Sequence, residues 1–196
     1  RASLEVPAGA IEAGDALAHT QSVVRLLPEL LDPAAASLVL FSSRRQMLDV
    51  YDQLEEDWRE RILVQGHKSK QAMLSSHRQS VDAGQGSVLF GLASFAEGVD
   101  LPGDYCNHVV IAKLPFSVPD DPIEAALSEW VEARGGNAFM EITVPDASLR
   151  LVQACGRLLR SEQDSGKITL LDRRIVTKRY GKAILNSLPP FKRLIA

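Results

Sequence analysis

Short apolar runs alternate along the chain with longer segments in which apolar residues recur every three or four positions. The apolar runs cover residues 37–41, 62–64, 87–90, 108–112 and 168–171. Uninterrupted runs of this length are typical of strands buried on both faces of a parallel sheet. Helical spacing predicts helices over 15–31, 44–57, 69–83, 121–133, 146–160 and 177–188. This alternation predicts an α/β fold with a doubly wound parallel sheet.

The pattern indicates a single domain, since it contains no internal repeat and no long linker. We expect residues 37–196 to form this domain and residues 1–36 to be a helical lead-in or a hinge. Ligands bind beyond the carboxyl ends of the strands in such sheets. The polar residues expected at that edge are Ser42, Ser43, Gln65, Gly91, Ser94, Lys113, Asp172 and Arg173.

Composition narrows the class of protein. The 196 residues are 45% hydrophobic and 24% charged, which excludes collagen, low-complexity disorder and a disulfide scaffold. The apolar runs are far shorter than the roughly 18 residues that span a bilayer, so no membrane partner is expected. Because the chain opens at Arg1 without an initiator Met or a leader, we expect an internal fragment or a processed chain from the cytoplasm. Its two cysteines are expected to be buried thiols, and its four histidines lack metal-ligand spacing.

The net charge of −3 hides an uneven distribution. Residues 1–149 carry 11 basic and 22 acidic side chains, whereas residues 150–196 carry 11 basic and 3 acidic ones. A basic quarter on an acidic body indicates a local site for phosphate or nucleic acid. A solvated basic face would give the same count, so charge alone leaves both interpretations open.

A polar stripe runs along the predicted helix 146–160. Arg150, Gln153, Arg157 and Arg160 fall at offsets 0, 3, 7 and 10, which places them on one side of a helix. Apolar residues occupy most of the remaining circumference, so we expect the helix to be largely buried. Buried arginine requires an anionic partner. That partner is either a local acid such as Glu97 or Asp100, or a polyphosphate held by a neighbouring domain.

A glycine-containing polar loop, 91–103, follows the predicted strand 87–90. Its residues Ser94, Glu97 and Asp100 can form hydrogen bonds, and Gly98 and Gly103 permit tight turns. By itself this loop is not specific. The chain also has no G-x-x-x-x-G-K-[ST] loop and no G-x-G-x-x-G loop, so it lacks a phosphate cradle of its own.

Taken together, three segments resemble motifs of superfamily 2 helicases. The sequence QACGRLLR at 153–160 matches the Q-x-x-G-R-x-x-R pattern of motif VI, AEGVDLPG at 96–103 resembles motif V, and LVLFSS at 38–43 resembles motif IV. The loop 114–122 and the tail 171–181 are similar to the DinG branch of the XPD-like helicases. The resemblance extends over nearly the whole chain from about residue 37.

The resemblance implies a RecA-like domain, the second motor domain of an ATP-dependent 5′–3′ DNA helicase acting in repair or replication. The expected partners are single-stranded DNA and the upstream RecA-like domain of the same polypeptide, with no obligate oligomer. That upstream domain would bind ATP and Mg²⁺ and carry a 4Fe–4S cluster, so this chain alone is expected to be inactive. The residues implied are Arg157, Arg160 and Gln153 for catalysis; Glu97, Gly98, Asp100 and Gly156 for ATP binding and coupling; Ser42, Ser43 and Ser94 for DNA binding; and none for metal.

Two other functions fit parts of the sequence. A non-catalytic α/β module that binds nucleic acid or regulates a partner would use the basic quarter, and its arginine stripe would contact only internal acids. A small-molecule enzyme such as a transferase would use the polar residues at the strand ends, but it would need a complete cofactor pocket. No glycine-rich loop supports that third function.

Overall fold

A computed structural model describes residues 2–116, 122–156 and 166–196. These residues form a seven-stranded sheet in the order β3-β4-β2-β5-β6-β1-β7, and the paired strands are parallel. The strands are β1 (Ser3–Val6), β2 (Ala36–Phe41), β3 (Ile62–Val64), β4 (Ser87–Leu92), β5 (His108–Ile111), β6 (Lys167–Leu170) and β7 (Lys192–Ile195). The parallel sheet predicted from the sequence is therefore confirmed, with two strands more than the pattern indicated.

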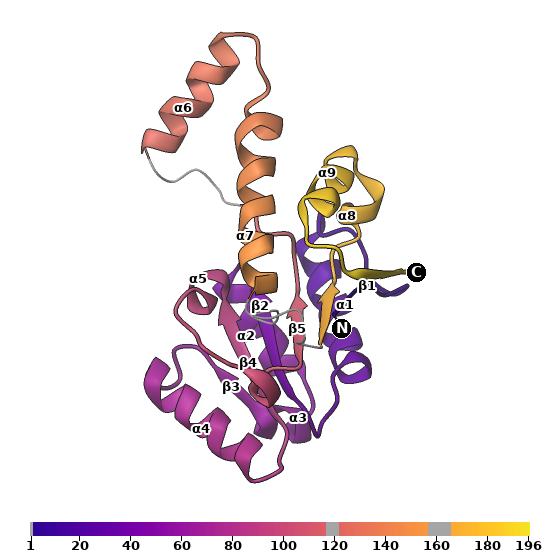
Figure 1. Cartoon of the computed structure of the whole chain (residues 1–196), viewed down its shortest axis with the longest axis vertical. Helices are drawn as coiled ribbons and strands as arrows, with labels where there is room; N and C mark the ends of the chain where they lie inside the picture. Colours follow the sequence, from indigo (N-terminus) through magenta and orange to yellow (C-terminus); the bar gives the residue numbers. More distant parts are fainter. Residues whose placement is uncertain (1, 117–121, 157–165) are drawn as a thin grey trace.

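Helices lie on both faces of the sheet. They are α1 (Ala16–Leu30), α2 (Arg44–Gln53), α3 (Glu56–Arg61), α4 (Lys70–Asp82), α5 (Ala93–Ala96), α6 (Pro122–Ala133), α7 (Val144–Gly156), α8 (Arg174–Thr177) and α9 (Arg179–Ser187). A 3₁₀ turn, η1 (Gly103–Tyr105), and a π-helical turn, η2 (Phe139–Thr143), complete the described elements. Figure 1 shows α6 and the outer part of α7 extending beyond the body of the molecule.

Alternation along an interior strand, β2, contributes to two cores. In β2, Leu38 and Leu40 join a core with residues of α4, α5, α7 and α9, whereas Val39 and Phe41 join a second core with residues of α1 and α2. All six residues of β2 are buried. Because successive side chains of a strand point to opposite faces, an uninterrupted apolar run serves both cores at once.

The N-terminal segment contributes to the sheet. Strand β1 pairs with β6 on one side and with β7 on the other, and its residues Leu4 and Val6 are buried. Helix α1 packs Val23 and Leu27 into the second core. Residues 3–30, part of the segment 1–36 expected as a lead-in or hinge, thus share the sheet and both of its cores with the rest of the chain.

Two predicted helices differ from the pattern. The segment expected as one helix over 44–57 divides into α2 and α3, because Leu54 takes an extended conformation and turns into the core, where it is 3% exposed. The expectation that the helix over 146–160 is largely buried is wrong for its described part. Leu149 is 58% exposed because α7 buries a single face, and the other side of its outer half reaches past the sheet.

Candidate functional site

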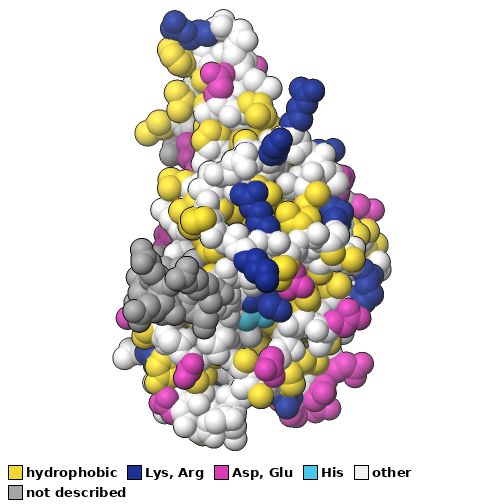
Figure 2. Space-filling model, turned by 45° about the vertical axis from the view of Figure 1, so that its right-hand side comes forward, with side chains coloured by type: hydrophobic (Ala, Val, Ile, Leu, Met, Phe, Trp, Pro, Cys, Tyr) yellow, Lys and Arg dark blue, Asp and Glu magenta, His cyan; other side chains and the backbone are white. Residues whose placement is uncertain are grey.

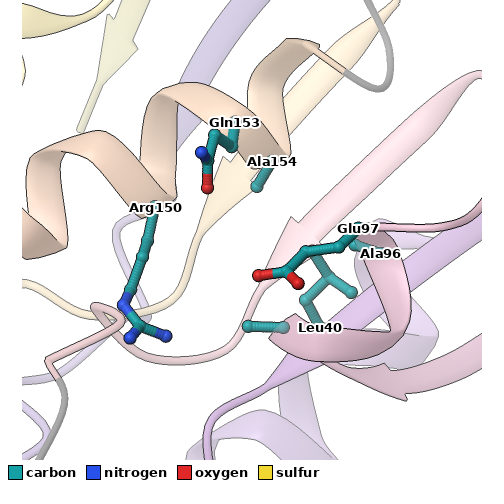
Figure 3. Close-up of a pocket in the computed structure, with 7 residues that line it drawn as sticks. Leu40, Ala96, Glu97, Arg150, Gln153 and Ala154 are labelled. Atoms are coloured by element: carbon teal, nitrogen blue, oxygen red, sulfur yellow. The ribbon is translucent and has the colours of Figure 1, made fainter.

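A hollow at the carboxyl end of the sheet lies between α5 and α7. It is lined by Leu40, Ala93, Ala96, Glu97, Arg150, Gln153 and Ala154. Figure 3 shows the Glu97 carboxylate and the Gln153 amide directed toward the space between the two helices. The hollow therefore brings residues of the segment 96–103 together with residues of the segment 153–160, more than fifty positions further along the sequence.

Helix α7 presents its polar residues because its opposite face is anchored. Its buried residues, at spacings of three and four, are Val144, Ala147, Leu151 and Cys155. Residues on the other side, including Gln153, are consequently exposed. The helical stripe predicted for Arg150 and Gln153 is thus observed over its described part.

Arg150 has an anionic partner within its own helix. Its Nε donates to Oδ2 of Asp146 at 2.9 Å, and both side chains are about one third exposed. An ion pair at this spacing and exposure contributes roughly 0.3–0.5 kcal/mol. Within the described residues Arg150 therefore pairs with an acid one turn earlier, rather than with Glu97 or Asp100, the two acids considered from the sequence.

The last described residue of α7 is Gly156. A Cβ added there would meet no atom within 4 Å, so packing within the described chain does not require glycine at this position. Arg157 and Arg160, the two arginines expected to act on ATP, lie outside the described residues. Their predicted role stays a prediction.

The loop after β4 alternates anchored and exposed residues. Phe95, Ala96, Val99 and Leu101 are buried in the first core. The neighbouring residues face solvent; these are Ser94, Glu97, Gly98 and Asp100. The backbone carbonyl of Asp100 accepts a hydrogen bond from Arg78 Nη2 at 2.8 Å. Alternate anchoring of this kind fixes the loop while it exposes the residues expected to couple nucleotide and DNA.

The three serines expected to bind DNA lie at the ends of adjacent strands. The register pairs Phe41 with Leu92, so Ser42 and Ser43 emerge beside the start of α5, which carries Ser94. Ser43 also has a structural role, because its hydroxyl accepts the backbone N–H of Gln46 at 3.2 Å and caps α2. Ser94 lines a different hollow from the one that holds Glu97.

Asp172, expected among the polar residues at the ligand edge, is buried instead. Its carboxylate accepts the backbone N–H groups of Ala13 and Leu114 at 3.3 and 3.1 Å, and it pairs with Arg174 Nη2 at 2.6 Å. Burial by itself raises the pKa of Asp172, but the Arg174 side chain and the backbone N–H groups of Leu114 and Arg174 outweigh burial, and the net pKa lies below the usual value. No local pattern indicates this burial, because the loops that cover Asp172 come from distant parts of the chain.

The basic quarter of the chain produces a localised surface feature. Figure 2 shows Lys and Arg side chains gathered in a band over the face that carries α8 and α9. Exposed members of this quarter include Lys178, Arg179 and Lys182. Basic side chains of this quarter are thus exposed on the surface of the molecule.

Both cysteines are free and buried, as the sequence predicted. Burial raises the pKa of the Cys106 and Cys155 thiols to about 12, so both are neutral at physiological pH. Among the described residues there is no group of three or more His, Cys, Asp or Glu side chains placed to hold a metal ion. No helix in this part of the chain is long and apolar enough to cross a membrane.

Comparisons with known proteins agree with this architecture. Residues 29–191 match the helicase C-terminal domain family. The ATP-dependent DNA helicase DinG of Photobacterium profundum is 48% identical over 199 residues, which cover 99% of this chain and 28% of that protein. DinG of Escherichia coli is 41% identical over 154 residues, or 79% of this chain and 21% of that protein. An XPD helicase structure aligns with the entire chain at 20% identity and a TM-score of 0.72, over 35% of its own chain.

The parallel sheet with helices on both faces and a hollow at its carboxyl edge defines a RecA-like α/β domain, as predicted. The chain belongs to the helicase C-terminal domain family, in its DinG/XPD-like branch, so the resemblance stated from motifs IV, V and VI is confirmed. It spans about a quarter of the length of these curated relatives.

Proposed function

We propose that this chain is the second motor domain of an ATP-dependent DNA helicase that moves 5′ to 3′ along single-stranded DNA. The observation that carries the proposal is the hollow between α5 and α7, where Glu97 and Gln153 face the same space. Family membership supports the helicase activity, since the relatives are named ATP-dependent DNA helicases. We assign the whole protein to DNA repair or replication in the cytoplasm.

The catalytic contribution of the chain is electrostatic. ATP and Mg²⁺ would be held by the upstream RecA-like domain, because this chain has no phosphate-binding glycine loop. Gln153 would orient the attacking water or the arginines, and Arg157 and Arg160 would stabilise the charge that develops on the γ-phosphate. An arginine acting in this way raises phosphoryl-transfer rates by about 10³–10⁵.

The chain's own residues do not fit an iron–sulfur cluster. Such a cluster requires about four thiolates, whereas this chain has two cysteines, both buried and both neutral at physiological pH. Any cluster of the whole protein would therefore be held by residues upstream, and no step of the proposed mechanism passes through it.

DNA would be held through its backbone at the ends of β2 and β4. Ser42, Ser43 and Ser94 offer hydroxyl groups there, and Glu97, Gly98 and Asp100 lie in the loop that joins this edge to the nucleotide hollow. Contacts to phosphates and sugars favour binding that is independent of sequence and sensitive to salt.

The first test is turnover by the whole helicase with Gln153→Ala, Arg157→Ala or Arg160→Ala. We expect kcat for DNA-stimulated ATP hydrolysis to fall at least about a hundredfold for an arginine variant, with an unchanged unfolding midpoint. Arg61→Ala is the matched control, because Arg61 is exposed at the end of α3, where β3 begins, away from the carboxyl edge of the sheet. Parallel losses of turnover and folded protein would contradict the catalytic assignment.

A second measurement separates the motor from a non-catalytic module. We expect no ATP hydrolysis by this chain alone, and DNA-stimulated hydrolysis after it is recombined with the upstream half. DNA binding without hydrolysis after recombination would favour the regulatory or nucleic-acid-binding module. Robust hydrolysis by the chain alone would mean that it contains a complete nucleotide site.

A further inference from the structure

Helix α4 lies beside the loop that carries the residues expected to couple nucleotide and DNA. This loop, residues 97–102, joins α5 to η1, and we call it the coupling loop. Met73 and His77 are the buried residues of α4, and Met73 packs into the first core. The helix is therefore anchored to the body of the domain, while the proposed function gives it no role.

The coupling loop has only weak means of its own to fix its backbone. Val99 and Leu101 are buried, which holds two of its side chains. The Val99 N–H donates to the Ala96 carbonyl at 3.3 Å, and the Tyr105 N–H donates to the Pro102 carbonyl at 3.3 Å. Both distances lie beyond the usual range of N–H···O bonds. Shorter hydrogen bonds reach this segment from α4.

Arg78 of α4 makes the contact nearest the middle of the coupling loop. Its Nη2 donates to the backbone carbonyl of Asp100 at 2.8 Å. Hydrogen bonds from a charged donor are stronger than those between neutral groups. Because the acceptor is a backbone atom, the bond fixes the path of the chain itself rather than the Asp100 side chain.

Two further residues of α4 hold the end of the loop, at Tyr105 of η1. His77 Nε2 lies 2.7 Å from the Tyr105 carbonyl, and its Nδ1 lies 2.8 Å from Ser87 Oγ. Since a carbonyl can only accept, Nε2 donates to it and Nδ1 accepts from the Ser87 hydroxyl. The Tyr105 hydroxyl in turn donates to Asp82 Oδ1 at 2.7 Å. Helix α4 thus holds Tyr105 by both its backbone and its side chain.

The first residue of α4 lies against the start of the loop. Lys70 Nζ is 5.3 Å from the centre of the Phe95 ring, and a Cβ added at Gly98 would lie 2.6 Å from the same nitrogen. The lack of a side chain at position 98 therefore allows this close approach. Residues 70, 78 and 82 of α4 meet residues 98, 100 and 105 in the same order along both segments.

We propose that α4 positions the coupling loop, with Arg78 and the Tyr105–Asp82 pair as positioning residues for the stimulation of ATP hydrolysis by DNA. The proposal rests on the proposed function, because it takes from it the role of the loop. Neither Arg78 nor Asp82 lines the hollow between α5 and α7, so both act through the loop. Small displacements of a loop lower the rate when the groups that it holds must meet a strict geometry.

The first test is ATP hydrolysis by the whole helicase with Arg78→Ala, with and without oligo-dT. We expect kcat in the presence of DNA to fall roughly tenfold, because the loop loses a charged hydrogen bond to its backbone. The DNA-free rate, the KM for ATP and the unfolding midpoint should keep their wild-type values. Gln79→Ala is the matched control, since Gln79 is the next residue of α4 and is exposed.

A second pair of variants removes or keeps a single hydrogen bond. Tyr105→Phe deletes the hydroxyl that donates to Asp82, whereas Asp82→Asn keeps an oxygen that accepts it. We expect Tyr105→Phe to lower DNA-stimulated turnover and Asp82→Asn to retain it. Equal turnover in the two variants would contradict a role for this bond.

Hydrogen exchange of the backbone reports on the loop directly. In Arg78→Ala we expect faster exchange over residues 97–105, with unchanged protection of β4 and β5. Unchanged exchange in the loop would overturn the proposal, and so would a lowered unfolding midpoint with equal losses of DNA-free and DNA-stimulated turnover.

The same measurements separate this proposal from the proposed function. If DNA stimulates the wild-type helicase and the Arg78→Ala variant equally, the role of α4 is wrong and the function stands. If DNA does not stimulate the wild-type helicase, the proposed function fails, and the role of α4 fails with it.

Discussion

Asp172 connects three distant parts of the chain through a single carboxylate. Its partners are the segment before α1, the loop after β5 and the start of α8, represented by Ala13, Leu114 and Arg174. Arg173 complements it by donating to the carbonyls of Pro7, Ala10 and Ala196. Sequence position placed Asp172 correctly at the end of β6 but could not reveal its burial, since covering loops are set by tertiary contacts.

Replacing this carboxylate tests its structural role. We expect Asp172→Ala to lower the free energy of unfolding by about 3–5 kcal/mol, because it leaves Arg174 and two backbone donors without their buried acceptor. Asp49→Ala is the control, since Asp49 forms a long, exposed 4.0 Å pair with Arg45. Urea denaturation measures the free energy of unfolding of both variants. Equal midpoints for the two variants would refute the assignment.

Helix α6 shows what periodicity conveys about an element and what it omits. The sequence pattern predicts a helix over 121–133, and α6 forms over Pro122–Ala133 and carries Ile123, Leu127 and Trp130. Yet these side chains are 77%, 46% and 56% exposed, and α6 buries no residue within the described chain. Periodicity identifies an apolar face but carries no information about the surface that would cover it.

The same substitution, Leu to Ala, can be made on both helices to compare the exposed face of α6 with the buried face of α7. We expect Leu127→Ala to alter the free energy of unfolding by less than about 0.5 kcal/mol, because Leu127 is 46% exposed on a helix that buries no residue within the described chain. Leu151→Ala, at a fully buried position of α7, should cost about 2–5 kcal/mol. Chemical denaturation of the two variants gives the comparison. A large cost at position 127 would show that α6 packs against the chain.

At the scale of the whole molecule, the sequence predicted the interior of the sheet better than its ends. The runs that became β2, β4 and β5 are buried on both faces, and burial of that kind is directly evident from composition. Strand β7 is exposed along its length, and β1 (sequence SLEV) alternates half-buried and buried residues, so neither produced a recognisable apolar run. The strand order depends on pairings between chain ends, which local patterns do not encode.

Buried histidines make the stability of the whole domain depend on pH. Burial lowers the pKa of His19, His77 and His108, and that of His108 falls to about 4, with the charge of Lys167 adding to the effect. A histidine of the unfolded chain titrates near pH 6.5, and a tenfold change in its proton affinity on folding corresponds to about 1.4 kcal/mol. The unfolded chain therefore binds more protons between pH 6.5 and 4, and stability falls as the pH is lowered through that range.

We expect His108 alone to account for a loss of roughly 3 kcal/mol between pH 7 and pH 4. Asp172, whose folded pKa lies below the usual value, adds a further loss as the pH falls below about 3.8. Urea unfolding midpoints at pH 7, 5.5 and 4.5 measure the loss of stability that we attribute to His108. His108→Gln should make the fall in stability with pH less steep. An unchanged pH dependence in that variant would show that His108 does not titrate as inferred.

The position of β1 between β6 and β7 also has a consequence for synthesis in the cell. Ser3 pairs with Lys167 and with Lys192, so the first strand has no neighbour until almost the entire domain has been translated. At elongation rates of about 5–20 residues per second, that interval lasts roughly 10–30 seconds. Strands β2 to β5 can assemble earlier, because they come from the continuous stretch 36–111. Leu4 and Val6 therefore lack their neighbouring strands for the whole of that interval.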